Sequence, residues 1–106
     1  MKLTDENCRP VMTGENSLSD NAVKELLVQI PEWTLREKSI EREFQFKDFK
    51  GSIAFVNKVA DLAERQNHHP DICIYYNKVK LVLSTNKIGG LSRNDFILAA
   101  KIDLLV

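Results

Sequence analysis

Two adjacent histidines, His68 and His69, are the residues in this chain best suited to proton chemistry, and Pro70 follows them. Histidine is the side chain whose ordinary pKa lies nearest neutral pH, so such a pair could give and accept protons. Because a residue before proline avoids the helical conformation, the pair should lie in a loop at a helix end. The alternative is a surface pair near a helix C-terminus, where positive charge is favoured.

Two carboxylates could assist these imidazoles. Glu64 precedes His68 by four residues and therefore shares its side of a helix, where it could form a hydrogen bond. Asp95 lies three residues after Ser92, at the start of a predicted helix. It could cap that helix, or it could bind a substrate group at the mouth of a pocket. A solvated carboxylate is the alternative for Glu64.

Metal binding is less well supported. Two imidazoles need further ligands, and zinc prefers nitrogen and sulfur partners in a tetrahedron. The two cysteines, Cys8 and Cys73, form no CxxC or Cys/His spacing. We therefore predict acid–base chemistry rather than a metal site. So few cysteines also favour a reducing compartment, and we expect a cytoplasmic protein.

The length of 106 residues suits a single small domain. Fifteen basic residues offset fifteen acidic ones, so the formal net charge is zero. A neutral chain lacks the positive charge that drives non-specific nucleic-acid binding, and no apolar run is long enough to span a membrane. We predict no direct nucleic-acid or membrane partner. Low repulsion between copies favours self-association.

Hydrophobic periodicity divides the chain into an arm and one domain. Residues 1–17 are polar and are predicted to be a loosely held N-terminal arm, and residues 18–106 form the domain. Helices are expected at 19–30, at 48–66 and from 92 onwards, and alternating strands at 33–35, 40–46, 72–76 and 79–84. This α-β-β-α-β-β-α order predicts an α+β two-layer sandwich, with a four-stranded antiparallel sheet and helices on one face.

The helix predicted at 48–66 carries a wide apolar arc. Five of its residues share one stripe, which we expect to face the sheet: Phe49, Ile53, Val56, Ala60 and Ala63. Phe55 and Leu62 lie seven residues apart on a flanking face. That flanking face could meet a second subunit.

Several of these residues together resemble a known enzyme family. The stretch from Glu64 through His68, His69 and Pro70 is followed by Tyr76, the Ser84-Thr85 loop, Gly90-Leu91-Ser92 and Asp95. This spacing resembles that of the pterin-4a-carbinolamine dehydratase family, also called 4a-hydroxytetrahydrobiopterin dehydratases. The runs 46–49 and 55–60 are similar to the family as well, so the resemblance covers roughly residues 18–106.

The resemblance implies a reaction and roles for individual residues. The family removes water from a 4a-hydroxytetrahydropterin to give a quinonoid dihydropterin, which serves tetrahydrobiopterin recycling after aromatic amino-acid hydroxylation. It implies His68 as the principal acid–base group and His69 as a substrate binder and second proton handler. Glu64 would orient the imidazoles, and Asp95 would hold the pterin or shape the pocket. Pro70 and Tyr76 would support the site, and the family's assembly implies a homodimer or homotetramer.

One position departs from the family pattern. Where the family carries His or Trp in the second hairpin, this chain has Asn86. Asparagine forms hydrogen bonds but exchanges no proton near neutral pH. The alternative function is therefore a catalytically weak relative that acts as a pterin-binding or protein-assembly module. Lys80 and Lys87 are the neighbouring side chains that could replace the missing imidazole, and a scaffold without any ligand is the third possibility.

Overall fold

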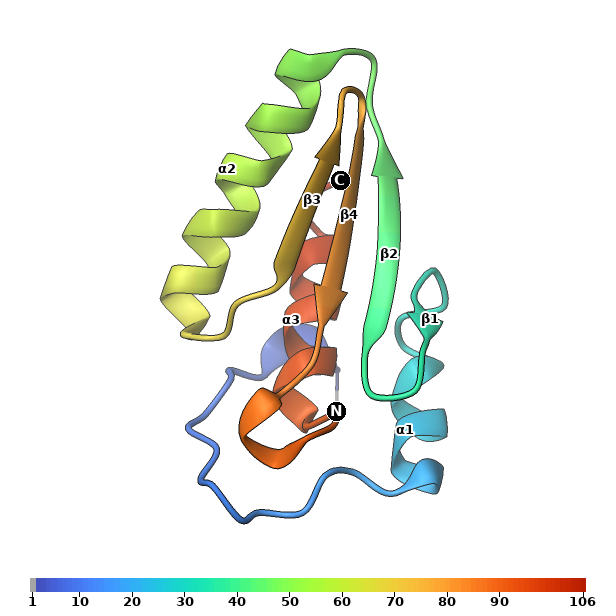
Figure 1. Cartoon of the computed structure of the whole chain (residues 1–106), viewed down its shortest axis with the longest axis vertical. Helices are drawn as coiled ribbons and strands as arrows, with labels where there is room; N and C mark the ends of the chain where they lie inside the picture. Colours follow the sequence, from blue (N-terminus) through green and yellow to red (C-terminus); the bar gives the residue numbers. More distant parts are fainter. Residues whose placement is uncertain (1) are drawn as a thin grey trace.

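The computed structural model describes residues 2–106 and contains a four-stranded antiparallel sheet with three α-helices (Figure 1). The sheet has the order β1-β2-β4-β3. The elements in chain order are η1 (Leu3–Asp5), α1 (Asp20–Leu27), β1 (Thr34–Leu35), β2 (Ile40–Gln45), α2 (Phe49–Gln66), β3 (Asp71–Tyr75), β4 (Lys78–Leu83), η2 (Asn86–Ile88) and α3 (Arg93–Asp103).

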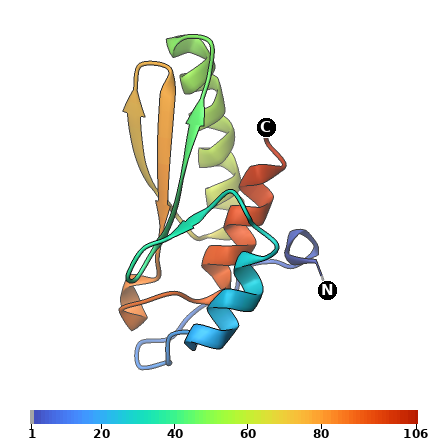
Figure 2. The same ribbon diagram turned by 90° about the vertical axis from the view of Figure 1, so that its right-hand side faces the viewer.

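The predicted two-layer α+β architecture is confirmed. The helices lie on one side of the sheet, and the other side is open (Figure 2). Period-two alternation produces this arrangement, since successive side chains of a strand point to opposite faces. In β4, Val79, Leu81 and Leu83 are fully buried, whereas Lys80 and Val82 lie between them on the open face. The strand pairing places Lys80 beside Glu43 on β2, so charged side chains cover much of the open face.

The predicted helix starts agree with the observed caps. Ser19 accepts a hydrogen bond from the Ala22 backbone at 3.2 Å at the start of α1. Asp48 accepts one from the Gly51 backbone at 2.9 Å at the start of α2. Such caps satisfy backbone N–H groups that a helix leaves unpaired in its first turn. Local sequence therefore fixes where these helices begin.

The face of α2 that enters the core differs from the predicted one. Phe55 is 3% exposed and Leu62 is 6% exposed, so the face we expected to meet a second subunit packs under the sheet. Phe49, expected to face the core, is 50% exposed, and Ala60 is exposed as well. The reason lies in the sheet: the Phe55 ring packs between other aromatic rings, 4.6 Å from Phe44 and 5.0 Å from Phe46.

The N-terminal residues are more firmly held than the sequence indicated. We expected a loose arm over residues 1–17, and Met1 lies outside the described residues. Leu3, however, is fully buried in the core, and its backbone N–H donates to the Gln29 side chain at 3.0 Å. Arg93 on α3 forms a bidentate ion pair with Glu6, in which both hydrogen bonds are 2.6 Å long. The segment therefore packs against α3 and is part of the domain.

The loop that follows β4 lies against this N-terminal segment. A Cβ atom on Gly90 would come within 2.9 Å of the Ser17 side chain, so this close approach requires glycine. The Leu18 backbone N–H donates to the Leu91 carbonyl at 2.9 Å. These contacts bring two segments that are about seventy residues apart to the same end of the sheet. No helix within residues 2–106 is long and apolar enough to cross a membrane.

Candidate active site

His68 is placed by the way α2 ends. Asn67 adopts the left-handed conformation with φ of 51°, which asparagine tolerates better than most residues. The His68 backbone N–H then donates to the Ala63 carbonyl at 3.2 Å, which closes the last turn. Because the chain reverses direction here, the His68 ring points back towards the start of α3. A helix C-terminus also favours a positive charge on a side chain beside it.

A buried carboxylate holds the His68 ring. Asp95 Oδ1 lies 2.6 Å from His68 Nε2, and the Asp95 side chain is 0% exposed. Its second oxygen, Oδ2, accepts hydrogen bonds from Thr85 Oγ1 at 2.8 Å and from the Ser92 backbone at 2.9 Å. The Thr85 and Ser92 hydroxyls are 2.7 Å apart. Because Thr85 donates its proton to Asp95, the Ser92 hydroxyl donates to Thr85.

This network fixes the roles of the two His68 nitrogens. With Asp95 as the acceptor, Nε2 carries a proton and donates it to the carboxylate. Within residues 2–106 no hydrogen bond to Nδ1 is observed, so that nitrogen remains free to exchange a proton with a ligand. A carboxylate behind an imidazole holds the orientation of the ring.

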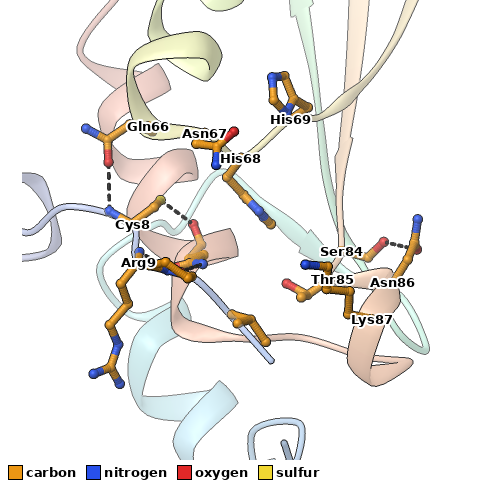
Figure 3. Close-up of a pocket in the computed structure, with 13 residues that line it drawn as sticks. Cys8, Arg9, Gln66, Asn67, His68, His69, Ser84, Thr85, Asn86 and Lys87 are labelled. Carbon is orange, nitrogen blue, oxygen red and sulfur yellow. Dashed lines mark hydrogen bonds between the residues drawn. The ribbon is translucent and has the colours of Figure 1, made fainter. Parts of the chain in front are cut away.

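His69 has a different environment. Its Nε2 lies 2.5 Å from Glu64 Oε2, and both side chains are largely exposed. Figure 3 shows the His69 ring directed away from the space that His68 points into. Glu64 therefore contacts one imidazole, not both as the sequence suggested. It is Asp95, not Glu64, that contacts the His68 ring, and the Asp95 side chain has no exposed surface.

His68 opens onto a pocket of about 340 Å³ (Figure 3). This volume lies at the lower end of the range typical of small-molecule sites. Three segments form its walls: residues 8–11 of the N-terminal segment, residues 66–69 at the end of α2, and residues 84–87 after β4. The complete lining is Cys8, Arg9, Pro10, Val11, Gln66, Asn67, His68, His69, Ser84, Thr85, Asn86, Lys87 and Asn94.

The structure brings some of the predicted site residues together and leaves others outside. His68, His69 and Asn86 line the same pocket. Ser84 Oγ lies 3.4 Å from Asn86 Oδ1 and restrains that amide. Pro70 does not line the pocket, and it leads from His69 into β3.

Tyr76 is remote from this pocket. It is 66% exposed and lies in the turn between β3 and β4, at the opposite end of the sheet (Figure 1). Its left-handed φ of 53° and the hydrogen bond from Ser52 Oγ to its carbonyl, at 2.7 Å, are features of a tight turn. In this structure Tyr76 therefore shapes the hairpin and makes no contact with the pocket.

The two lysines proposed as substitutes for the missing imidazole are also separated. Lys87 lines the pocket beside Asn86. Lys80 lies on the open face of the sheet, where its ammonium is 3.5 Å from the Glu41 carboxylate. Lys87 is therefore the lysine that could act on a ligand in this pocket.

Sequence reasoning missed the N-terminal wall and the two amides that hold it. The Cys8 backbone N–H donates to Gln66 Oε1 at 2.7 Å. Asn94 pairs with Arg9 twice, accepting from its backbone N–H at 3.0 Å and donating to its carbonyl at 2.7 Å. These contacts join residues 58 or more positions apart, and hydrophobic periodicity carries no information about such pairs. The amide side chains next to His68 and Asp95 were the available signal.

Burial raises the pKa of the Cys8 thiol to about 11, and the nearby negative charge of Asp95 adds to the effect. The thiol is therefore mostly protonated at neutral pH and is a weak nucleophile there. Within residues 2–106, no three or more His, Cys, Asp or Glu side chains gather where they could hold a metal ion.

Taken together, the fold and the site define a small α+β domain with a histidine–carboxylate pair at the base of a ligand-sized pocket. Residues 16–105 match the family model described as pterin 4 alpha carbinolamine dehydratase. The chain therefore belongs to the pterin-4a-carbinolamine dehydratase family, as the resemblance indicated.

Individual relatives agree with this assignment. A Halorhodospira halophila protein provisionally named pterin-4-alpha-carbinolamine dehydratase is 43% identical, and the match covers 99% of this chain and 98% of that protein. An Acidobacterium capsulatum protein with the same provisional name is 49% identical, covering 84% of this chain and 97% of that protein.

Two solved structures share the fold. The crystal structure of a transcriptional coactivator/pterin dehydratase from Brucella melitensis has a TM-score of 0.80 and 30% identity, covering 85% of this chain and 98% of that chain. A pterin dehydratase-like protein identified as a RuBisCO assembly factor in the alpha-carboxysome has a TM-score of 0.57 and 22% identity, covering 69% and 84%. The second similarity concerns the fold alone.

Proposed function

We propose that this protein dehydrates 4a-hydroxytetrahydrobiopterin to quinonoid dihydropterin, by acid–base catalysis without metal or organic cofactor. The observation that carries the proposal is the His68–Asp95 pair, whose contact of 2.6 Å lies at the base of a pocket of about 340 Å³. Membership of the dehydratase family supports the choice of substrate. The reaction would serve tetrahydrobiopterin recycling after aromatic amino-acid hydroxylation.

The reaction requires one proton to be given and one to be removed. The C4a–oxygen bond breaks with its electron pair on oxygen, and a proton from the His68 imidazolium turns the leaving hydroxyl into water. A ring N–H proton is lost from the pterin, and its electron pair forms the new double bond. His69 lines the pocket, and its ring must turn from Glu64 towards the ligand to handle this second proton and contact the substrate. Asp95 keeps the His68 ring in position and balances its charge.

The test is dehydration of freshly generated 4a-hydroxytetrahydrobiopterin, followed by absorbance against the spontaneous reaction. We expect the wild type to accelerate the reaction. His68→Ala should lose about 10²- to 10⁴-fold, the usual contribution of a general acid–base group. A wild type at the spontaneous rate, or full activity in His68→Ala, would contradict the proposal.

Asn86 keeps a second function open, because it lines the pocket and cannot exchange a proton. In that case the domain binds a pterin, or assembles with another protein, without catalysing the reaction. The related carboxysome protein, identified as a RuBisCO assembly factor, is an example of such a role elsewhere on this fold. An inactive wild type that Asn86→His converts into an enzyme would favour this second function.

The proposal includes self-association into a homodimer or homotetramer. The formal net charge of zero provides little repulsion between copies. Light scattering coupled to size-exclusion chromatography measures the mass directly, and a single species of 12.1 kDa would contradict this part of the proposal.

A further inference from the structure

The N-terminal segment contributes one complete wall of the pocket. Residues 8–11, which we call the N-terminal strap, face the His68 ring across the pocket (Figure 3). The family match begins only at residue 16, so the strap lies before the part of the chain that defines the family. The catalytic pair and the strap are therefore separate features of the sequence, and the fold joins them.

Asn94 and Gln66 attach the strap to the elements that carry the catalytic pair. Asn94 directly precedes Asp95 and forms two hydrogen bonds with the Arg9 backbone. Gln66 lies two residues before His68 and binds both the Cys8 backbone N–H and the Asn7 side chain. A shift of the strap would therefore change the width of the pocket directly above His68.

We infer that the N-terminal strap is a substrate-binding and specificity-determining wall of this site, and that Asn94 is the positioning residue that holds it. The inference rests on the proposed function for its substrate class, a pterin. Cys8 and Pro10 of the strap line the pocket, and the Cys8 Sγ also donates to the Asn94 carbonyl at 3.5 Å. These uncharged side chains suit contact with a flat heterocycle better than contact with a charged group. The strap excludes solvent from one side of the bound pterin and takes no part in proton transfer.

The chain contains a built-in reporter for this wall. Cys8 lies on the strap, whereas Cys73 is exposed on β3, on the open face of the sheet. A ligand in the pocket should cover the first thiol and leave the second untouched. Cys73 thus serves as an internal control for every alkylation experiment.

The first experiment measures alkylation of both thiols by iodoacetamide, with mass spectrometry, in the presence of L-biopterin, an oxidised pterin that cannot be dehydrated. It is run at alkaline pH, where part of the Cys8 thiol is ionised and can react. At a hundred times the dissociation constant, Cys8 alkylation should slow by about a hundredfold, because only the free form reacts. The Cys73 rate should stay constant. Binding is measured separately by quenching of pterin fluorescence.

The second experiment releases the strap. Asn94→Ala removes both bonds to Arg9, so Cys8 alkylation should rise more than tenfold. In the dehydration assay KM should rise roughly tenfold with kcat within about twofold, since the lost interaction concerns binding in the ground state and the transition state alike. Phe49→Ala is the control: it changes an exposed side chain at the far end of α2 and should leave KM and Cys8 alkylation unchanged.

The outcomes separate the two ideas. If biopterin binds without protecting Cys8, or Asn94→Ala exposes Cys8 without raising KM, the strap is not part of the site even though the dehydratase proposal stands. If no pterin binds and no turnover occurs, the proposed function fails first. Should Asn94→Ala not fold, Gln66→Ala releases the strap from its other anchor, and its Cys8 alkylation rate provides the same comparison.

Discussion

The site contains two histidine–carboxylate contacts of similar length but of very different environment. The His68 Nε2 atom lies 2.6 Å from Asp95 Oδ1, and the Asp95 side chain has no exposed surface. The His69 Nε2 atom lies 2.5 Å from Glu64 Oε2, and both of these side chains are exposed to solvent. Water screens an exposed pair and competes for its hydrogen bonds, so such pairs contribute about 0–1 kcal/mol. A buried carboxylate that accepts three hydrogen bonds has no such competition. The two contacts should therefore respond differently to the same chemical change.

We predict that Asp95→Asn is far more damaging than Glu64→Gln. The amide removes the negative charge behind His68 and replaces one acceptor oxygen by a donor, so either His68 or Thr85 loses its partner. Dehydration should fall by about 10²-fold in Asp95→Asn, whereas Glu64→Gln should stay within about threefold of wild type. The cost in unfolding free energy should be about 1–3 kcal/mol for the buried group.

Steady-state kinetics and urea unfolding of the two variants measure both effects. The wild type and Glu64→Gln serve as matched references, since each variant changes one carboxylate to its amide. Equal losses in the two variants would show that burial of Asp95 does not matter for the reaction.

At the scale of single elements, the packing face of α2 gives a direct test. Phe55 is 3% exposed and packs between the Phe44 and Phe46 rings, whereas Phe49 on the same helix is 50% exposed. Phe55→Ala should lower the unfolding free energy by about 3–5 kcal/mol, because it leaves a cavity between aromatic rings. Phe49→Ala should cost less than about 1 kcal/mol. Denaturant unfolding followed by tryptophan fluorescence measures the unfolding free energy of both variants. A larger loss in Phe49→Ala than in Phe55→Ala would show that the face of α2 predicted from the sequence is the one that enters the core.

The same helix shows how far sequence alone can reach. Its start at Asp48 and its end before His68 were predictable, because caps and the following loop act within a few residues. The choice between two overlapping apolar stripes was not predictable, since the burial of Phe55 depends on the rings of Phe44 and Phe46, in and just after β2. The four strands of the sheet likewise followed from alternation, while the burial of Leu3 followed from nothing near it in sequence.

In the candidate site, too, local features were predictable from the sequence and contacts between distant segments were not. His68, His69 and Asn86 were predicted and do share a pocket, because each lies at the end of a recognisable element. Which carboxylate meets which imidazole depends on how α3 crosses the end of α2, and local spacing favoured Glu64 over Asp95. The strap could not be predicted, because its contacts to Gln66 and Asn94 join opposite ends of the chain.

The docking of the N-terminal segment on α3 should depend on pH. The Arg93 guanidinium, through hydrogen bonds and its charge, holds the pKa of Glu6 below its ordinary value of 4.5. A lowered folded-state pKa stabilises the protein above that ordinary value, and the contribution disappears as the pH falls through the folded-state pKa. Glu6→Gln should therefore cost about 0.5 kcal/mol at pH 7 and nothing at strongly acidic pH.

Urea unfolding of wild type and Glu6→Gln at several pH values checks this dependence. Arg93→Lys, which keeps the charge but not the two-bonded geometry, should fall between the two proteins. A difference between wild type and Glu6→Gln that stays constant down to strongly acidic pH would show that the ion pair does not anchor the segment.

At the scale of the whole molecule, the pocket brings together parts of the chain that are otherwise independent. Its walls come from residues 8–11, 66–69 and 84–87, together with Asn94. The exposed aromatic residues Tyr75 and Tyr76 lie at the far end of the sheet, so they are separate from this site (Figure 1). A ligand in the pocket therefore joins the N-terminal segment, the end of α2 and the loop after β4. Unfolding must separate all three, and binding should be visible as global stability.

We therefore predict a large thermal shift with L-biopterin. At a hundred times its dissociation constant, a ligand that binds only the folded state adds about 2.7 kcal/mol, which for a domain of this size raises Tm by about 10 °C or more. Asn94→Ala, with affinity about tenfold weaker, should gain about 1.4 kcal/mol at the same concentration and show roughly half the shift. Phe49→Ala, changed far from the pocket, should keep the full shift. Differential scanning fluorimetry over a biopterin titration measures the shift in the wild type and in both variants. An undiminished shift in Asn94→Ala would show that the N-terminal strap is not part of the binding site.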